Sequence, residues 1–238
     1  MKYMAFPENF TPELVIESPG RINLVGEHTD YNLGYVLPTA IEKKITFKFK
    51  KNHTDKECRL FSLGFDTGFT LQLDKIARSA VEWENYVLGV LNEILLRTDR
   101  LKGFDCTIES KLPMGSGLSS SAALECGLAF GLNELFQLGL SKMDIVQLSQ
   151  KAEHTFVGTQ CGIMDQFASV MSKKGHVLLL DCQSLEHQQI PIHIDPYKMI
   201  MLNTKVSHNL ASSEYNTRKR ECEEGVGIIQ RRYPEVTS

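Results

Sequence analysis

The sequence has 238 residues, of which 42% are hydrophobic and 23% are charged, so it can bury one large core or two smaller ones. Its formal net charge of −3 excludes the basic surface that nucleic acids and anionic membranes require, so we expect neither as a partner. The sequence has no apolar run as long as a membrane span, no signal-peptide pattern, and six scattered cysteines without metal-site spacing. We therefore expect a cytoplasmic protein with reduced thiols.

The predicted elements of the first half are mostly strands. Residues 13–17 predict a short strand, and residues 45–49 predict a half-exposed strand because Ile45, Phe47 and Phe49 alternate with polar residues. Further strands are predicted over residues 58–63, 69–73 and 104–109. A helix is predicted over residues 83–97, where apolar residues recur at helical spacing.

The second half is predicted to be mostly helical. One helix should run over residues 120–136, and another should begin at Ser141, where the Ser141-x-x-Asp144 spacing fits a capping box. The second of these helices has one apolar face, formed by Ile145, Leu148, Ala152 and Phe156. Residues 176–180 and 199–202 predict late strands, and residues 212–231 predict a charged helix. Because strands precede helices, the order indicates an α+β fold rather than a doubly wound sheet.

The segment from Gly20 to Tyr31, GRINLVGEHTDY, is predicted as a loop with an unusual density of short polar side chains. It lacks the apolar run of a buried strand and the lysines and glutamates of a solvated helix. Glu27 and Asp30 offer paired acceptors, which suit the neighbouring hydroxyls of a polyhydroxylated ligand. The alternative interpretation is a polar turn held by its own capping side chains.

The segment LPMGSGLSSSAA, residues 112–123, combines two glycines with three successive serines at the predicted start of a helix. Gly115 and Gly117 permit tight turns and close approach to a ligand, and a helix N-terminus attracts anions. No lysine follows the glycines, so this is not a Walker A motif. The residues alone predict either a phosphate-binding loop or an ordinary serine-capped turn.

The segment KAEHTFVGTQCGIMDQF, residues 151–167, contains two candidate functional acids. Glu153 should lie at the end of a helix whose other face is apolar, and Asp165 stands in an otherwise uncharged stretch. Each is either a capping carboxylate or a working one, and the residues alone leave both interpretations open.

Together these segments resemble the galactokinase branch of the GHMP small-molecule kinases. The resemblance rests on the sugar signature over residues 20–31, the phosphate loop over 113–123, CGIMDQF, and HNLASSEYNTRKRECEE over 208–224. They occur in family order and span roughly residues 15–225. The sugar signature is specific to galactokinases, whereas the serine-rich loop identifies only the wider superfamily.

The resemblance implies ATP-dependent phosphorylation of galactose at its C1 hydroxyl. It identifies Asp165 as the catalytic base and Arg21 as the cation beside it, which favours the charged form of the acid and stabilises transferred negative charge. The substrate-binding residues that it implies are Glu27, His28, Thr29, Asp30, Gly162 and Tyr215.

The same resemblance implies ATP and Mg²⁺ as cofactors. Ser121 and Glu153 match the magnesium ligands, and hard oxygen ligands of this kind suit Mg²⁺. The match of Ser62 to the adenine side is looser. The nucleotide-binding residues that it implies are Ser62, Gly115, Ser116, Gly117, Leu118, Ser119, Ser120 and Ser121.

The family fold implies an α+β architecture of two parts. Residues 1–190 correspond to an N-terminal domain like domain 2 of ribosomal protein S5, and residues 191–238 correspond to the beginning of a ferredoxin-like C-terminal domain. Family members continue beyond the position where this sequence stops, so we expect a truncated chain of poor activity and a monomer when full length.

Two other functions occur within the same family. Some relatives phosphorylate N-acetylgalactosamine, and some bind galactose and ATP only as transcriptional sensors. The sensors have lost a Ser-Ala dipeptide from the phosphate loop, whereas Ser121 and Ala122 are present here. This difference favours a sugar kinase over a sensor, and it leaves the choice between the two sugars open.

Overall fold

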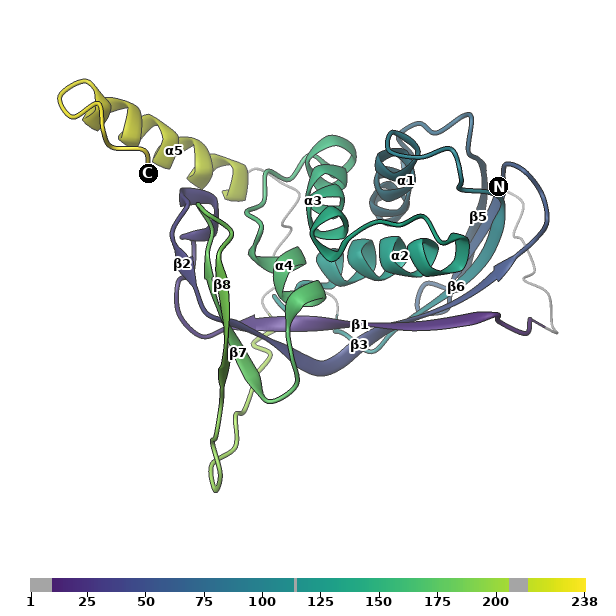
Figure 1. Cartoon of the computed structure of the whole chain (residues 1–238), viewed down its shortest axis with the longest axis horizontal. Coiled ribbons are helices and arrows are strands. Elements are labelled where there is room, and N and C mark those ends of the chain that lie inside the picture. The colour runs from purple at the N-terminus through teal and green to yellow at the C-terminus, as the bar shows by residue number, and fades with distance from the viewer. Residues whose placement is uncertain (1–9, 114, 206–213) are drawn as a thin grey trace.

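The computed structural model describes residues 10–113, 115–205 and 214–238 (Figure 1). Its strands are β1 (Leu14–Asn23), β2 (Tyr35–Val36), β3 (Pro38–Lys51), β4 (Glu57–Ser62), β5 (Thr67–Gln72), β6 (Phe104–Ser110), β7 (His176–Asp181) and β8 (His187–Pro191). Its α-helices are α1 (Glu82–Leu95), α2 (Ser120–Phe136), α3 (Lys142–Ala152), α4 (Met164–Met171) and α5 (Glu214–Gln230). A short 3₁₀ turn, η1 (Asp30–Asn32), and a π turn, η2 (Glu153–Val157), complete the set.

The larger sheet has five strands in the order β1-β3-β6-β4-β5. Neighbouring strands are antiparallel except β4 and β6, which run parallel and are separated in sequence by β5 and α1. Helices α1, α2 and α3 lie on one side of this sheet, while α5 projects from the end near η1 and β2 (Figure 1). The arrangement confirms the α+β fold class.

Helix α2 forms the centre of the main core and packs directly on β1 and β3. Most of its residues are buried, as expected for a helix that is apolar on nearly all sides. Two glycines allow the close approach: a Cβ at Gly127 would lie 2.3 Å from the ring of Phe47, and one at Gly131 would lie 2.1 Å from the ring of Phe49. The main core therefore fixes where α2 begins, next to the predicted phosphate loop.

A second, smaller core lies between α4 and the three-stranded sheet β2-β7-β8. Phe167 of α4 is fully buried in it and packs with Leu178 and Leu180 of β7. Because Asp165 stands two residues before Phe167 on the same helix, this core holds the predicted base in place.

Most predicted elements are confirmed within a few residues, including the capping box at Ser141 and Asp144. The strand predicted over 13–17 is longer, because β1 continues to Asn23 after a register shift between Pro19 and Arg21. The first residues of the predicted sugar loop therefore belong to a strand. The strand predicted over 199–202 is wrong, since these residues form neither strand nor helix and their apolar side chains are exposed.

The sequence analysis missed β2, β8, α4 and both short turns. β8 has the sequence HQQIP, which lacks the apolar alternation of a half-buried strand. α4 was missed although Met164, Phe167 and Ala168 have helical spacing, because its eight residues follow a loop directly. The charged helix predicted over 212–231 is observed as α5, with residues 212 and 213 outside the described residues. No helix in the part of the chain that the structure describes is long and apolar enough to cross a membrane.

The contact between α2 and the sheet gives a stability prediction. We expect Gly127→Ala to lower the free energy of unfolding by about 1–3 kcal/mol through overpacking against Phe47, even though alanine favours a helix by about 1 kcal/mol over glycine. The measurement is urea unfolding. The matched control is Gly225→Ala in α5, where a Cβ has no heavy-atom neighbour within 4 Å, so its stability should be unchanged or higher. Equal effects at the two sites would contradict the packing argument.

Candidate active site

Arg21, on β1, joins the predicted phosphate loop to α4. Its Nε donates to Asp165 Oδ1 at 2.7 Å, and its Nη2 lies 2.6 Å from the same oxygen. Its Nη1 donates to the carbonyl oxygen of Gly117 at 2.8 Å. Arg21 and Asp165 are 144 positions apart in sequence, and the side chains of both are largely buried, so the pair is a fixed feature of the fold.

The backbone of β1 also touches the phosphate loop. The amide of Arg21 donates to the carbonyl oxygen of Leu118 at 3.2 Å. A Cβ at Gly20 would lie 2.6 Å from that oxygen, so only glycine permits this contact. Gly115 and Gly117 adopt positive φ angles of 63° and 72°, as a tight turn before a helix requires.

Ser119, the N-cap of α2, occupies a strained position. Its φ of 56° is in the left-handed region, which usually costs a non-glycine residue about 1–3 kcal/mol and is frequent at functional sites. Its hydroxyl does not cap the helix but donates to Asp165 Oδ2. The first turn of α2 therefore keeps free backbone N–H groups, while Ser119 faces the predicted base instead of the loop interior.

Asp30 and Gly162 meet directly at the predicted sugar side. A Cβ at Gly162 would lie only 2.0 Å from Asp30 Oδ2, so the carboxylate fills the space that a larger residue would need. Asp30 is 7% exposed. Burial, with the nearby negative charge of Asp165, raises the pKa of Asp30 to about 6. Two acids from distant segments therefore face one region.

Tyr215 of α5 completes this region. Its Oη accepts a hydrogen bond from the amide of Gly162 at 3.3 Å, and its ring lies edge-on to Tyr31 with centroids 5.0 Å apart. Burial raises the pKa of the Tyr215 hydroxyl, so this group stays neutral and keeps its proton to donate. Four of the predicted residues, Asp30, Gly162, Asp165 and Tyr215, thus come together.

The other predicted sugar residues differ in their surroundings. Glu27 is exposed. His28 is also exposed, and its Nδ1 lies 2.9 Å from Tyr31 Oη. The Thr29 hydroxyl lies 2.8 Å from the carbonyl oxygens of both Gly26 and Tyr35, so it is occupied in holding the loop's own backbone.

Glu153 is the first residue of the π turn and is buried beside the start of α2. The nearby Ser121 hydroxyl lowers the pKa of its carboxyl group, so the two predicted magnesium ligands lie near one another. Cys161 Sγ also donates to Glu153 Oε2, at 3.5 Å. Burial, followed by the charge of Asp165, raises the pKa of Glu153 to about 7.

Two residues of this network were missed by the sequence analysis. Gln166 Nε2 donates to Glu153 Oε2 at 2.9 Å and lies 3.4 Å from Glu125 Oε2. Glu125 is completely buried in α2, and its burial and the nearby charge of Glu153 raise its pKa far above the usual range. A charged residue inside an otherwise apolar helix was the available signal. Burial therefore favours the neutral form of Glu125.

Ser62 stands apart from this group. It ends β4, and its register partners are Thr67 on β5 and Ile108 on β6. Beyond it, Phe65 stacks on Trp83 with centroids 6.0 Å apart. The assignment of Ser62 to the adenine side stays a prediction.

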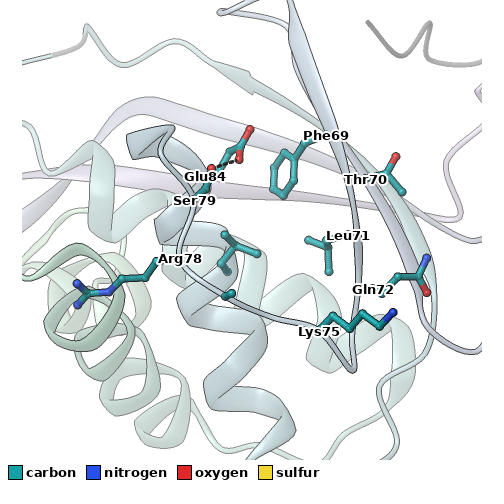
Figure 2. Close-up of a pocket in the computed structure, with 10 residues that line it drawn as sticks. Phe69, Thr70, Leu71, Gln72, Lys75, Arg78, Ser79 and Glu84 are labelled. Carbon is teal, nitrogen blue, oxygen red and sulfur yellow. Dashed lines mark hydrogen bonds between the residues drawn. The ribbon is translucent and has the colours of Figure 1, made fainter. Parts of the chain in front are cut away.

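A separate hollow of about 500 Å³ lies between β5 and the segment that leads into α1. Figure 2 shows the residues that line it. Its lining includes Phe69, Lys75 and Arg78, and at its edge the Ser79 hydroxyl donates to Glu84 at 2.5 Å. No residue that the sequence analysis assigned to the site lines this hollow.

Two family models match the sequence. The "Galactokinase galactose-binding signature" matches residues 4–51, and the "GHMP kinases N terminal domain" matches residues 85–173. The chain is 41% identical to the galactokinase of Thermosipho africanus over 90% of its own length, and 42% identical to that of Chloroflexus aggregans over 96%. It covers 59% of each of these proteins, so it spans about three fifths of the length of the curated relatives it matches.

Solved structures give the same relationship. The galactokinase of Lactococcus lactis, complexed with galactose, matches 93% of this chain with a TM-score of 0.87 and 36% identity, and 58% of that protein is covered. The mevalonate kinase of Methanococcus jannaschii, at 23% identity, matches 77% of this chain with a TM-score of 0.62, and 57% of it is covered. That second likeness shows that the fold is shared. In sequence and in fold this chain is therefore similar to the galactokinases, and its residues 85–173 match the N-terminal domain of the GHMP kinases.

Proposed function

We propose that the protein of this chain is a galactokinase, which transfers a phosphoryl group from ATP to the C1 hydroxyl of galactose. The observation that carries the proposal is the ion pair of Arg21 and Asp165, which lies between the phosphate loop and the Asp30–Gly162 region. The galactokinase relatives support the choice of sugar. The direct test is a coupled ADP-release assay with ATP and a panel that includes galactose and N-acetylgalactosamine. If the protein phosphorylated neither of these two sugars, the proposal would be contradicted.

In this mechanism Asp165 accepts the proton of the attacking sugar hydroxyl. Arg21 occupies Oδ1 and Ser119 occupies Oδ2, so both oxygens are held in position before substrate arrives. The guanidinium also supplies positive charge where the transferred phosphoryl group becomes more negative. Positioning and fixed charge provide most of the acceleration in phosphoryl transfer, and the base adds a more modest factor.

Sugar recognition is assigned to the region around Asp30. Asp30 and Glu27 accept hydrogen bonds from sugar hydroxyls, His28 and the amide of Gly162 supply polar contacts, and Tyr215 donates its hydroxyl proton. Thr29 acts through the backbone that it holds. An analogue that lacks one of the sugar hydroxyls would leave a carboxylate oxygen without a hydrogen-bond partner. The site therefore binds such an analogue more weakly than the complete sugar.

The nucleotide is assigned to the loop before α2 and the first turn of that helix. Free N–H groups at a helix start bind phosphate oxygens. The loop backbone from Gly115 to Leu118 and the hydroxyls of Ser116, Ser120 and Ser121 line this approach, and Ser62 is assigned to the adenine side.

The donor set fits Mg²⁺ bound together with ATP. Among the described residues, no three His, Cys, Asp or Glu side chains gather into a metal site, so these residues alone do not form a complete cage. Mg²⁺ usually takes one or two protein oxygens together with phosphates and waters. Ser121 and the Glu153 carboxyl group, which lie near one another, match that requirement. When bound, the ion would neutralise phosphate charge.

We also propose the domain boundary near residue 190. Its support is that β8 ends at Pro191 and that residues 192–205 form no helix or strand. The exposed apolar side chains of Ile200 and Leu202 suit a segment that packs on a further part of a longer protein.

The first functional prediction concerns the base. We expect Asp165→Asn to reduce turnover by at least about 100-fold and to change galactose affinity only a few-fold, because the amide keeps the shape but accepts no proton. The measurements are kcat and calorimetric galactose binding. Retention of more than about a tenth of wild-type turnover would exclude Asp165 as the base.

The second functional prediction concerns the metal. We expect Ser121→Ala and Glu153→Gln each to raise the Mg²⁺ concentration needed for half-maximal activity, because each removes an oxygen ligand. Galactose affinity should stay nearly constant and serves as the internal control. Unchanged magnesium titrations in both variants would show that these side chains do not hold the ion.

The third functional prediction is that Asp30 lowers the stability of the ligand-free protein but is needed for galactose binding. Its pKa is raised from 3.8 to about 6, so the folded state without ligand binds the proton more tightly than the unfolded chain and loses stability as pH rises through that interval. Asp30→Asn should therefore raise the ligand-free stability by up to about 3 kcal/mol near neutral pH, and by progressively less as the pH falls toward about 4. The same variant should lose the stabilisation that galactose gives. Thermal unfolding with and without galactose measures both effects, and a pH-independent stability difference would contradict the prediction.

A further inference from the structure

The contacts of helix α5 with the rest of the described chain include residues of its first three turns. Figure 1 shows it projecting beyond η1 and β2, and most of its later side chains are exposed or half-exposed. Its contacts include the ring of Tyr215 against Tyr31, and Asn32 Nδ2, which lies 3.5 Å from Cys222 Sγ. Asn216 adds two short polar contacts.

The Asn216 amide bridges the loop that joins the π turn to α4. Its Oδ1 accepts from the amide of Gln160 at 2.9 Å, and its Nδ2 donates to the carbonyl oxygen of Gly158 at 3.0 Å. The side chain thus pairs with one N–H and one C=O two residues apart, as a neighbouring peptide group of a sheet would. The Asn216 side chain therefore gives the backbone of this loop hydrogen bonds of the kind that a neighbouring strand gives in a sheet.

The bridged loop lies between groups assigned to catalysis. It begins directly after the π turn that opens with Glu153, and it ends at Gly162, which touches Asp30. On its inner side, Gln150 Nε2 donates to the carbonyl oxygen of Cys161 at 3.2 Å, and His154 Nε2 lies 2.8 Å from the same oxygen. Thr159, in the middle of the bridge, is 3% exposed and so points inward. Asn216 fixes the outer side of the same loop.

We propose that Asn216 is a positioning residue for the sugar site. By bridging Gly158 and Gln160, it holds the loop so that the Gly162 amide meets Tyr215 and the sugar, and it couples the docking of α5 to the formation of that site. Tyr215 is the adjacent residue of α5, so the same turn of the helix provides both the sugar contact and the bridge. The identity of the sugar in this inference rests on the proposed function. The position of the loop rests on the two hydrogen bonds of Asn216.

Two substitutions separate the bridge from the helix. Asn216→Ala removes both hydrogen bonds, whereas Asn216→Asp keeps the acceptor for Gln160 and places a carboxylate oxygen against the Gly158 carbonyl. Alanine has a higher helix propensity than asparagine, and an aspartate in the first helical turn favours the helix dipole. Neither change weakens α5 itself, so an effect on the sugar site reports on the loop. Arg220→Ala is the control, since its side chain is exposed and pairs with Glu224 within the helix.

The experiment combines amide hydrogen exchange at Gln160 with calorimetric galactose binding on the complete protein. In Asn216→Ala the Gln160 amide should exchange about fivefold faster, as loss of one hydrogen bond implies, whereas Asn216→Asp should retain its protection. Both variants should weaken galactose binding by about tenfold while the KM for ATP stays within twofold of wild type. Arg220→Ala should change none of these quantities.

Each deviation has a distinct meaning. Unchanged exchange at Gln160 in Asn216→Ala would show that the bridge does not form and would overturn the inference. Faster exchange with unchanged galactose affinity would show that the bridge does not position the sugar site, and this too would overturn it. If wild-type protein bound no galactose, the proposed function would fail, while the exchange rates would still decide whether the bridge exists.

Discussion

The ion pair between Arg21 and Asp165 is the contact on which the arrangement of the site depends. A guanidinium has several donors in a fixed plane, so it can hold a carboxylate and a backbone carbonyl at the same time. Arg21 uses this property to join β1, the loop before α2 and α4. A lysine would supply the charge without the fork, so it could not hold Asp165 and the Gly117 carbonyl in the same way. The pair therefore fixes geometry as well as charge.

The groups assigned to chemistry stand on rigid elements, and those assigned to sugar recognition stand mostly on loops. Arg21 lies on β1, which pairs with β3 along its length, and Asp165 lies on a helix anchored by the buried ring of Phe167. Asp30 and Gly162 lie on short connections that meet only because the sheets and helices bring them together. This division agrees with the general observation that scaffolds position catalytic groups precisely while loops determine specificity.

The sequence predicted the elements with strong periodicity and missed those without it. The alternation of Ile45, Phe47 and Phe49 identified β3, whereas the HQQIP strand has no such pattern and was missed. Motif resemblance identified most of the site residues, but it could not show that the Ser119 hydroxyl faces Asp165. It also could not show that Glu125, 28 positions before Glu153 in sequence, lies near that residue. Both facts depend on how distant segments pack, which local propensity does not encode.

The π turn at residues 153–157 limits where insertions and deletions can occur in this sequence. A π turn contains one residue more per turn than an α-helix, and such turns are usually retained because they redirect a side chain. Deleting one residue there would restore regular helix and rotate everything after it by about 100° about the helix axis. Glu153 would then no longer share a network with Gln166. We therefore expect insertions and deletions among natural variants of this protein to avoid this turn, although the neighbouring hairpin between β7 and β8 should accept them.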